Sequence, residues 1–246
     1  MSGHSKWSTI KRKKGKIDQE RGAIFSKLIR EIMMAAKIGG GDPDANSRLR
    51  LAIDKAKANN MPNDNIKRAV QKGSSANDSA NLEEIMFEAY GPYGVAMMIS
   101  VVTDNRNRTV PNIKSVLNKT NGSMATKGAV SYMFEQKGLI IFEPGADEEK
   151  IMELAIDAGA DDVVTNPDGS IEVSTTPSSY EAVKKAFDSN NLTYVSAELT
   201  WISKTDVALN QDQSEKILRL IEKLEDDDDV QAVYANYELP EGFEGE

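Results

Sequence analysis

The sequence contains no cysteine and only one histidine, His4. Without cysteine there is no disulfide framework, no thiolate nucleophile and no cysteine-ligated zinc site. His4 lies near the start of the chain in a basic segment with little apolar periodicity, which argues against a Ser-His-Asp centre or a histidine metal site. Long hydrophobic runs are missing too. Residues 95–99 form one of the longest, far short of a membrane span, and the first residues lack the apolar core of a signal peptide. These absences predict a cytoplasmic protein with no membrane partner.

Motifs for nucleotide or metal chemistry are also missing. There is no G-x-x-x-x-G-K-[ST] loop and no G-x-G-x-x-G element. The acidic run at residues 226–229 has four consecutive carboxylates, which point in divergent directions and lack the alternating spacing of a calcium loop. A solvated acidic turn is the favoured interpretation of this run. The sequence therefore predicts no catalytic residue, no metal and no cofactor. A hydrolase or nuclease that uses these acidic residues is the alternative.

The acidic excess, a net charge of −9, is confined to one part of the chain. Residues 1–73 hold 17 Lys and Arg against 7 Asp and Glu, whereas residues 74–246 hold 13 against 32. This asymmetry indicates a basic module for a polyanion, with an acidic remainder that discourages indiscriminate association. A solvated basic surface without a specific partner is the alternative.

The basic third is predicted to be an arm followed by three short amphipathic helices. Residues 1–17 form the arm, which is rich in Lys and Arg. A first helix over residues 18–38 ends at three consecutive glycines. A second helix begins at Asp42 and Pro43, and a third ends at Gly73.

Beyond a Ser- and Asn-rich linker the apolar period becomes that of strands. The elements expected in a central layer are strands at residues 85–90, 95–102 and 129–135 and a helix at about residues 110–117. From residue 139 to residue 201 the order strand, helix, strand, strand, helix, strand is that of a ferredoxin-like unit. A helix at residues 214–224 and a strand at residues 230–238 remain, and we expect them to return to the central layer.

The predicted fold class is therefore α+β with several domains. The first, at residues 1–80, is the basic arm with the helical bundle. The second is a central α+β domain at residues 81–137 and 205–246, completed by the C-terminal helix and strand. The third is an inserted ferredoxin-like domain at residues 138–204.

Two basic features indicate contact with nucleic acid. The run of four cations at residues 11–14 follows Lys6 and Trp7, whose indole could stack on a base or pin the arm to the bundle. The second feature is a loop in which Arg106 and Arg108 precede a helix that Thr109 can cap, so both guanidinium groups are expected to converge on one anion.

An ion pair between Arg106 and Asp104 is the structural alternative for that loop. Lys27 and Arg30 lie nearly opposite the apolar face of the first helix, so we expect them to point outward. The predicted nucleic-acid-binding residues are Lys6, Trp7, Lys11, Arg12, Lys13, Lys14, Lys27, Arg30, Arg106, Arg108, Lys114 and Lys119.

Several long motifs in one order resemble the YebC family over essentially the whole chain. They are Gly3-His4-Ser5-Lys6-Trp7, Phe25-Ser26-Lys27-Leu28-Ile29-Arg30-Glu31-Ile32, Asn59-Asn60-Met61-Pro62, Tyr90-Gly91-Pro92 and Thr103-Asp104-Asn105-Arg106-Asn107-Arg108-Thr109. The resemblance implies a three-domain α+β protein and a DNA-binding transcriptional regulator. The family's mitochondrial and some bacterial members act instead in translation, the latter on ribosomes stalled at proline-rich stretches. The family usually has glycine where this chain has Tyr93 and Ala125, so either loop must adjust if its backbone needs a positive φ.

We therefore expect a non-enzymatic, nucleic-acid-binding regulator of gene expression. A ribosome-associated translation factor that binds structured RNA is the alternative, because phosphate contacts alone do not separate DNA from RNA. A protein-interaction adaptor that uses the acidic domains is a third interpretation. The oligomeric state is left open.

Overall fold

The computed structural model describes residues 21–79, 81–240 and 243. They divide into two compact units. One holds the described residues up to Ser131 together with Asp212–Ala235, and the other holds Tyr132–Gln211 with the residues from Asn236 onward. The first unit contains both the helical bundle and a four-stranded sheet, and the second contains the ferredoxin-like sheet. The division into three domains with the boundaries given above stays a prediction.

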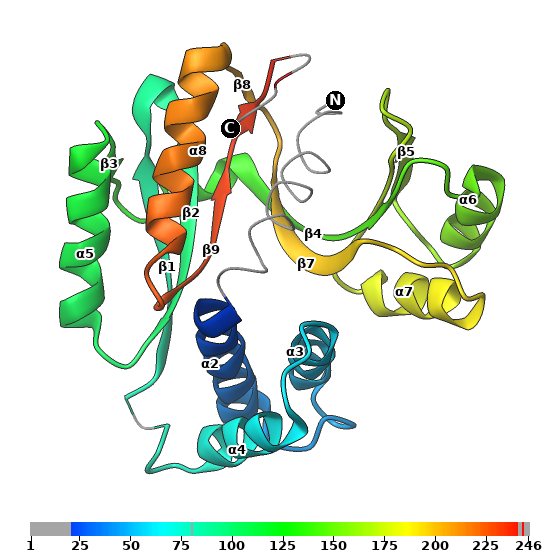
Figure 1. Cartoon of the computed structure of the whole chain (residues 1–246), viewed down its shortest axis with the longest axis horizontal. Helices are drawn as coiled ribbons and strands as arrows, with labels where there is room; N and C mark the ends of the chain where they lie inside the picture. Colours follow the sequence, from blue (N-terminus) through cyan, green and yellow to red (C-terminus); the bar gives the residue numbers. More distant parts are fainter. Residues whose placement is uncertain (1–20, 80, 241–242, 244–246) are drawn as a thin grey trace. The chain divides into compact units, whose positions relative to one another are not determined.

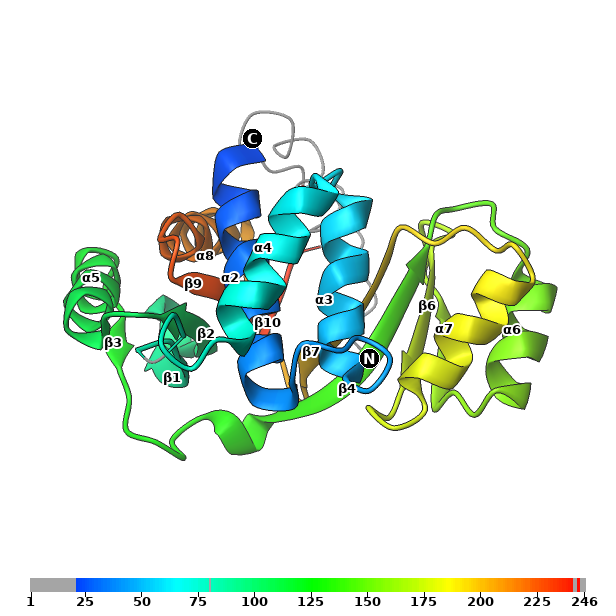
Figure 2. The ribbon, with the colours of Figure 1, turned by 90° about the horizontal axis from the view of Figure 1, so that it is seen from below.

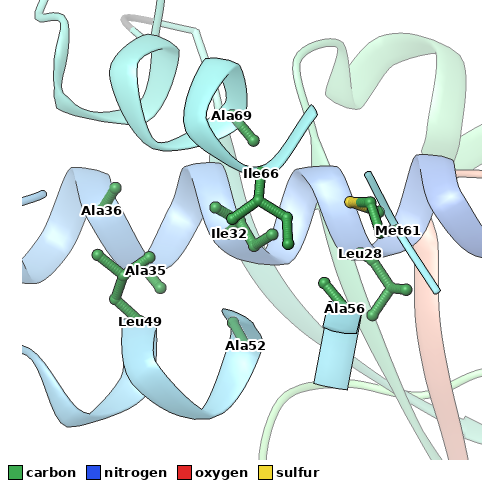
Figure 3. Packing of buried hydrophobic residues seen from close by; sticks show 10 residues of the cluster. All are labelled: Leu28, Ile32, Ala35, Ala36, Leu49, Ala52, Ala56, Met61, Ile66 and Ala69. Atoms are coloured by element: carbon green, nitrogen blue, oxygen red, sulfur yellow. The ribbon is translucent and has the colours of Figure 1, made fainter. Parts of the chain in front are cut away.

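The helical bundle consists of α2 (Arg21–Gly39), α3 (Ser47–Ala58) and α4 (Asn63–Ser74). Small residues alternate with larger ones in its core, as Figure 3 shows, so the helices approach closely. The buried core residues are Leu28, Ile32, Ala35, Ala36, Leu49, Ala52, Ala56, Met61, Ile66 and Ala69. At the crossing of α2 and α4, a Cβ on Gly73 would lie 2.4 Å from the carbonyl oxygen of Met33. Gly73 lies near the end of α4, as the sequence predicts, and it also allows the close approach of the two backbones.

The second helix begins later than the sequence predicts. The cap is Asn46, whose side chain accepts the backbone N–H of Leu49 at 3.1 Å. The side-chain amide of Asn46 also donates to the carbonyl oxygens of Ala35 and Gly40, at 2.9 and 2.8 Å. Asp42 instead accepts the N–H of Asp44 in the preceding turn. The expected cap at Asp42 is wrong because Asn46 satisfies both the helix start and the preceding turn.

The first unit's sheet has the strand order β3-β1-β2-β9. Its strands are β1 (Glu83–Tyr90), β2 (Ala96–Thr103), β3 (Ser123–Met124) and β9 (Val230–Ala235). Side chains alternate along β2, so that Val102 packs against Met34 of α2, whereas Met97 lies on the face near α8 (Gln211–Glu225). Helix α5 (Arg106–Lys119) belongs to the same layer as α8, and both are seen beside the sheet in Figure 1. The C-terminal helix and strand thus complete this layer, with β9 beside β2.

Two strand predictions are wrong in this region. The expected strand at residues 129–135 is a turn, the 3-10 helix η2 (Ser131–Met133), and the beginning of β4 (Phe134–Phe142). The expected strand at residues 230–238 is divided at Asn236 into β9 and β10 (Tyr237–Glu238). Strand β10 pairs in parallel with β8 (Val207–Ala208), and both belong to the second unit.

The turn between β1 and β2 has a left-handed residue at position 93, where this chain has tyrosine and not glycine. Tyr93, in the 3-10 helix η1 (Pro92–Gly94), has φ 64° and ψ 15°. For a residue with a Cβ this conformation costs about 1–2 kcal/mol. Ala125, the other departure from the family pattern, is not among the residues with positive φ.

The second unit confirms the predicted ferredoxin-like arrangement. Its strands are β4, β5 (Asp162–Thr165), β6 (Ile171–Thr175) and β7 (Ser196–Ser203), in the order β5-β6-β4-β7 and antiparallel throughout. Figure 2 shows α6 (Glu148–Asp157) and α7 (Tyr180–Ser189) side by side on one face of this sheet. The core between helices and sheet includes an edge-to-face pair of Phe142 and Phe187, with ring centroids 5.1 Å apart.

Gly138 lies inside β4, at the residue where the sequence predicts the inserted domain to begin. A Cβ at this position would lie 2.3 Å from Oγ1 of Thr175 and 2.5 Å from Cδ2 of Tyr180, which is fully buried. The glycine therefore makes room for the tyrosine ring rather than interrupting the strand.

Replacing Gly138 with alanine should lower the free energy of unfolding by about 1–3 kcal/mol, because the methyl group overpacks a closed site. Gly145→Ala is the control, since Gly145 has φ 89° and no atom within 4 Å of the added Cβ, so that only backbone strain is introduced. Chemical denaturation of both variants measures the difference. A Gly138→Ala protein as stable as the wild type would contradict the close approach.

Candidate nucleic-acid interface

Half of the predicted binding residues lie outside the described residues. They are Lys6, Trp7, Lys11, Arg12, Lys13 and Lys14. The other half, Lys27, Arg30, Arg106, Arg108, Lys114 and Lys119, lie on α2 and α5. The structure divides these six into two groups with different surroundings.

The first group surrounds the buried carboxylate of Asp229, whose side chain is 2% exposed. Asp229 lies between α8 and β9 and receives hydrogen bonds from Thr109 Oγ1 at 2.6 Å and Thr103 Oγ1 at 3.1 Å. Arg108 approaches both carboxylate oxygens, at 2.9 and 2.7 Å, and Arg30 forms an ion pair at 3.1 Å. The carboxylate thereby joins α2, the end of β2, the start of α5 and the turn before β9.

The acidic turn therefore differs from the solvated turn expected from the sequence. Asp229 is buried, and the side chain of Asp227 accepts the backbone N–H of Asp229 at 2.9 Å. In the described ranges, no three His, Asp or Glu side chains are grouped so as to hold a metal ion. The same part of the chain contains no helix with the length and apolar character of a membrane span.

Lys27 and Arg30 do not extend freely from α2, so the expectation that they point outward is wrong. The ammonium of Lys27 donates to the carbonyl oxygen of Glu225 at the end of α8, and Arg30 donates to the carbonyl oxygen of Asp228. A cation at the C-terminus of a helix satisfies an orphan carbonyl and complements the helix dipole. Helical periodicity placed both residues opposite the bundle core, but it could not show that α8 and β9 return to that side.

Arg106 and Arg108 face different surroundings, so the expected convergence on one anion is also wrong. The helix begins at Arg106, because the side chain of Asn105, not Thr109, caps it by accepting the N–H of Arg108 at 3.2 Å. Residues two apart on a helix are rotated by about 200°. Arg108 turns to Asp229 and also pairs with Asp104 at 3.0 Å, the partner that the sequence suggested for Arg106.

The second group lies along α5, where a pocket of about 430 Å³ is formed between this helix and the strands β1 and β3. Arg106 and Lys114 line it together with Asn107, and the apolar part comes from α5, β1 and β3. The full lining is Phe87, Arg106, Asn107, Val110, Pro111, Lys114, Met124 and Ala125. Lys119 lies further along α5, exposed in its last turn, and does not line the pocket. The structure thus brings Arg106 and Lys114 to one pocket. Lys119, in the last turn of α5, lies outside it.

A second buried carboxylate fixes the segment that follows β3. Glu88 accepts the backbone N–H groups of Gly128 at 2.6 Å, Val130 at 2.7 Å and Ser131 at 2.9 Å. Its own carbonyl oxygen accepts the N–H of Ala125 at 2.8 Å. Burial raises the pKa of Glu88, but the three backbone hydrogen bonds outweigh that effect and leave its pKa below the ordinary value.

Sequence reasoning missed one cationic group in the bundle. Lys67, Arg68 and Lys72 are exposed on α4, and Lys57 is exposed on α3. They add positive charge to the same unit. The helical spacing of the apolar residues Ile66, Ala69 and Val70 could have predicted this group, because it leaves the α4 cations on the outer side of the helix.

Replacing Asp229 with asparagine should lower the free energy of unfolding by about 2–3 kcal/mol. Uncharged asparagine leaves Arg30 and Arg108 without their shared partner, and the 47% exposure of Arg108 moderates the cost. Asp228→Asn is the matched control, because the side chain of Asp228 is exposed and its backbone carbonyl is retained. Equal stability of the two variants in urea would show that the buried carboxylate of Asp229 does not stabilise the fold.

The carboxylate of Asp229 should also make the free energy of unfolding depend on pH in the acidic range. Burial raises the pKa of Asp229, but hydrogen bonds from Thr109 and Arg108 and the charge of Arg30 outweigh this effect and hold the pKa below its ordinary value. A lowered pKa stabilises the folded state at neutral pH, and this contribution is lost as the pH falls from about 5 through the folded-state pKa. Asp229→Asn should therefore lose less unfolding free energy than the wild type between about pH 5 and pH 3. Parallel pH profiles of the two proteins would contradict this assignment.

Comparison with known proteins agrees with the resemblance seen in the motifs. A family model described as the TACO1/YebC protein N-terminal domain matches residues 5–76, and one described as the TACO1/YebC second and third domain matches residues 82–237. A protein of Trichlorobacter lovleyi is 52% identical over 239 residues, covering 97% of this chain and 96% of that protein. A Coxiella burnetii protein is 50% identical over 241 residues, covering 98% and 99%. Both relatives bear the name probable transcriptional regulatory protein.

A solved structure has the same fold. The crystal structure of a conserved hypothetical protein from Aquifex aeolicus superimposes with a TM-score of 0.85 at 40% sequence identity, covering 94% of this chain and 96% of that one. The family models and the near full-length relatives together show that the chain belongs to the TACO1/YebC family.

Proposed function

We propose that this protein is a nucleic-acid-binding regulator of gene expression that acts in the cytoplasm without enzymatic activity of its own. The relatives named as probable transcriptional regulatory proteins support the class of function. The contact surface is inferred from one observation, the exposed pair of Arg106 and Lys114 beside an apolar pocket. Neither cation forms an ion pair within the described part of the chain, so both can neutralise phosphates.

The division of cations in the structure favours α5 over α2 as the contact surface. Lys27, Arg30 and Arg108 already donate to oxygens of the α8–β9 turn or of Asp229. Recruiting Arg30 or Arg108 to phosphate would leave the buried carboxylate of Asp229 less compensated, and recruiting Lys27 would break its hydrogen bond to the carbonyl oxygen of Glu225. Arg106, Lys114 and Lys119 have no such cost. We propose that they act together with the basic residues that precede α2, which account for much of the positive charge of residues 1–73.

The target in this proposal is DNA, in line with the names of the relatives. Phosphate contacts position a protein without identifying the polymer, so structured RNA has to be compared directly. A regulator of translation would prefer the RNA, and a regulator of transcription the DNA duplex.

Reversing both pocket charges, Arg106→Glu with Lys114→Glu, should weaken binding to duplex DNA or structured RNA at least about tenfold. On DNA it should also reduce the slope of log affinity against log salt concentration by about 0.9 for each phosphate that is no longer neutralised. Fluorescence anisotropy over a series of salt concentrations measures both quantities. Unfolding of the variant should remain close to that of the wild type, since exposed substitutions rarely cost more than about 0.5 kcal/mol.

The matched control is Arg219→Glu with Lys223→Glu on α8, which makes the same change in net charge at two exposed helical residues. Binding by this control should fall much less. An equal loss of affinity in both double variants would assign the effect to net charge and not to the α5 surface.

A further inference from the structure

We propose that the pocket on α5 takes one unstacked nucleobase from an unpaired segment of nucleic acid, with the neighbouring phosphates on Arg106 and Lys114. This inference rests on the proposed function and adds the kind of nucleic-acid structure that the protein recognises. It follows from the combination of an aromatic and apolar floor, two flanking cations and a side-chain amide in one pocket.

The floor of the pocket offers an aromatic ring to a base. Phe87 is half-buried in β1 and pairs in register with Ile99 of β2, which places it on the α5 side of the sheet. Val110 and Pro111 of α5, Met124 of β3 and Ala125 complete the apolar part of the lining. Every base has a π face, so stacking on phenylalanine accepts any of them, and apolar contacts add to the same interaction.

The charges on the rim match a nucleotide and not an uncharged ligand. Arg106 and Lys114 are eight residues apart on α5, about 12 Å along the helix axis. The lining contains these two cations and no carboxylate. Asn107, next to Arg106 in the sequence, also lines the pocket and has both donor and acceptor groups for the edge of a base. An acidic peptide would satisfy the cations but would leave the aromatic floor without a planar partner.

The pocket discriminates against an intact duplex. Bases in a duplex are stacked on one another, and extruding one costs a few kcal/mol, whereas a base in a loop or single strand is already accessible. A volume of about 430 Å³ lies within the range of small-ligand pockets. Single-stranded or looped segments of DNA or RNA are therefore the expected partners of the pocket itself, whereas a duplex contacts only the cations on its rim through phosphates.

Phe87→Leu tests the stacking, because leucine keeps the apolar contact with the sheet and removes the ring. The probes are a short single-stranded RNA, a single-stranded DNA of the same sequence, a blunt duplex of equal length and a fully abasic strand that keeps only the phosphates. The matched control is Phe25→Leu, the same change at a partly buried phenylalanine that packs against the bundle core. Thermal unfolding confirms that each variant is folded.

We expect Phe87→Leu to bind the single strands about tenfold more weakly than the wild type, and the duplex with little change. The wild type should bind the abasic strand as weakly as Phe87→Leu binds the normal strand. Phe25→Leu should match the wild type on all probes. Comparison of the RNA and DNA single strands shows which polymer supplies the base.

Three results would overturn the pocket assignment. One is equal binding of the normal and abasic strands by the wild type, which needs no variant and is unaffected by folding. Another is a folded Phe87→Leu protein that binds single strands normally, and the third is an equal loss of affinity for single strand and duplex. In these cases binding itself persists, so the proposed function stands. If the wild type binds none of the probes, the proposed function and the pocket assignment are both wrong.

Discussion

The buried carboxylate of Asp229 is the interaction on which the arrangement of the first unit depends. A carboxylate with 2% exposure is costly to bury unless it is paired and hydrogen-bonded. Here two threonine hydroxyls and two arginines supply that compensation, from β2, α5 and α2. Three regions far apart in the sequence, namely α2, the junction of β2 and α5, and the turn before β9, must therefore meet at this one carboxylate. The position of α5 relative to the sheet and to the bundle follows from this requirement.

That requirement also decides which basic residues remain available to a partner. Arg108 is held by Asp229 and Asp104, so the helical rotation directs Arg106 to the opposite side of α5. The same separation operates on α2, where Lys27 and Arg30 are bound to the α8–β9 turn. Cations that compensate buried or orphan oxygens are thus distinguished from the exposed cations Arg106, Lys114 and Lys119 of α5. In the sequence alone, both kinds are simply Lys or Arg.

The sequence predicts local structure and family well because these depend on short-range patterns. The ferredoxin-like order of elements and the three-helix bundle were both predicted from periodicity and glycine positions. Contacts between distant segments were not predictable in this way. The return of the C-terminal helix and strand to the central layer was expected, but not that it buries Asp229 against β2 and α5. The need for glycine at residue 138 likewise arises from the ring of Tyr180, 42 residues later in the chain. The pocket likewise needs the register that places Phe87 opposite Ile99.

The pocket is built on a frame that two compensated carboxylates hold in place. Asp229 fixes the first turn of α5, which carries Arg106 and Asn107. Glu88 binds three backbone N–H groups of residues 128–131, and its carbonyl oxygen holds Ala125 on the pocket's other wall. A site whose walls are fixed before binding loses less conformational entropy when a ligand arrives. The two carboxylates therefore contribute to recognition indirectly, because they preorganise a rim whose own cations remain unpaired within the described residues.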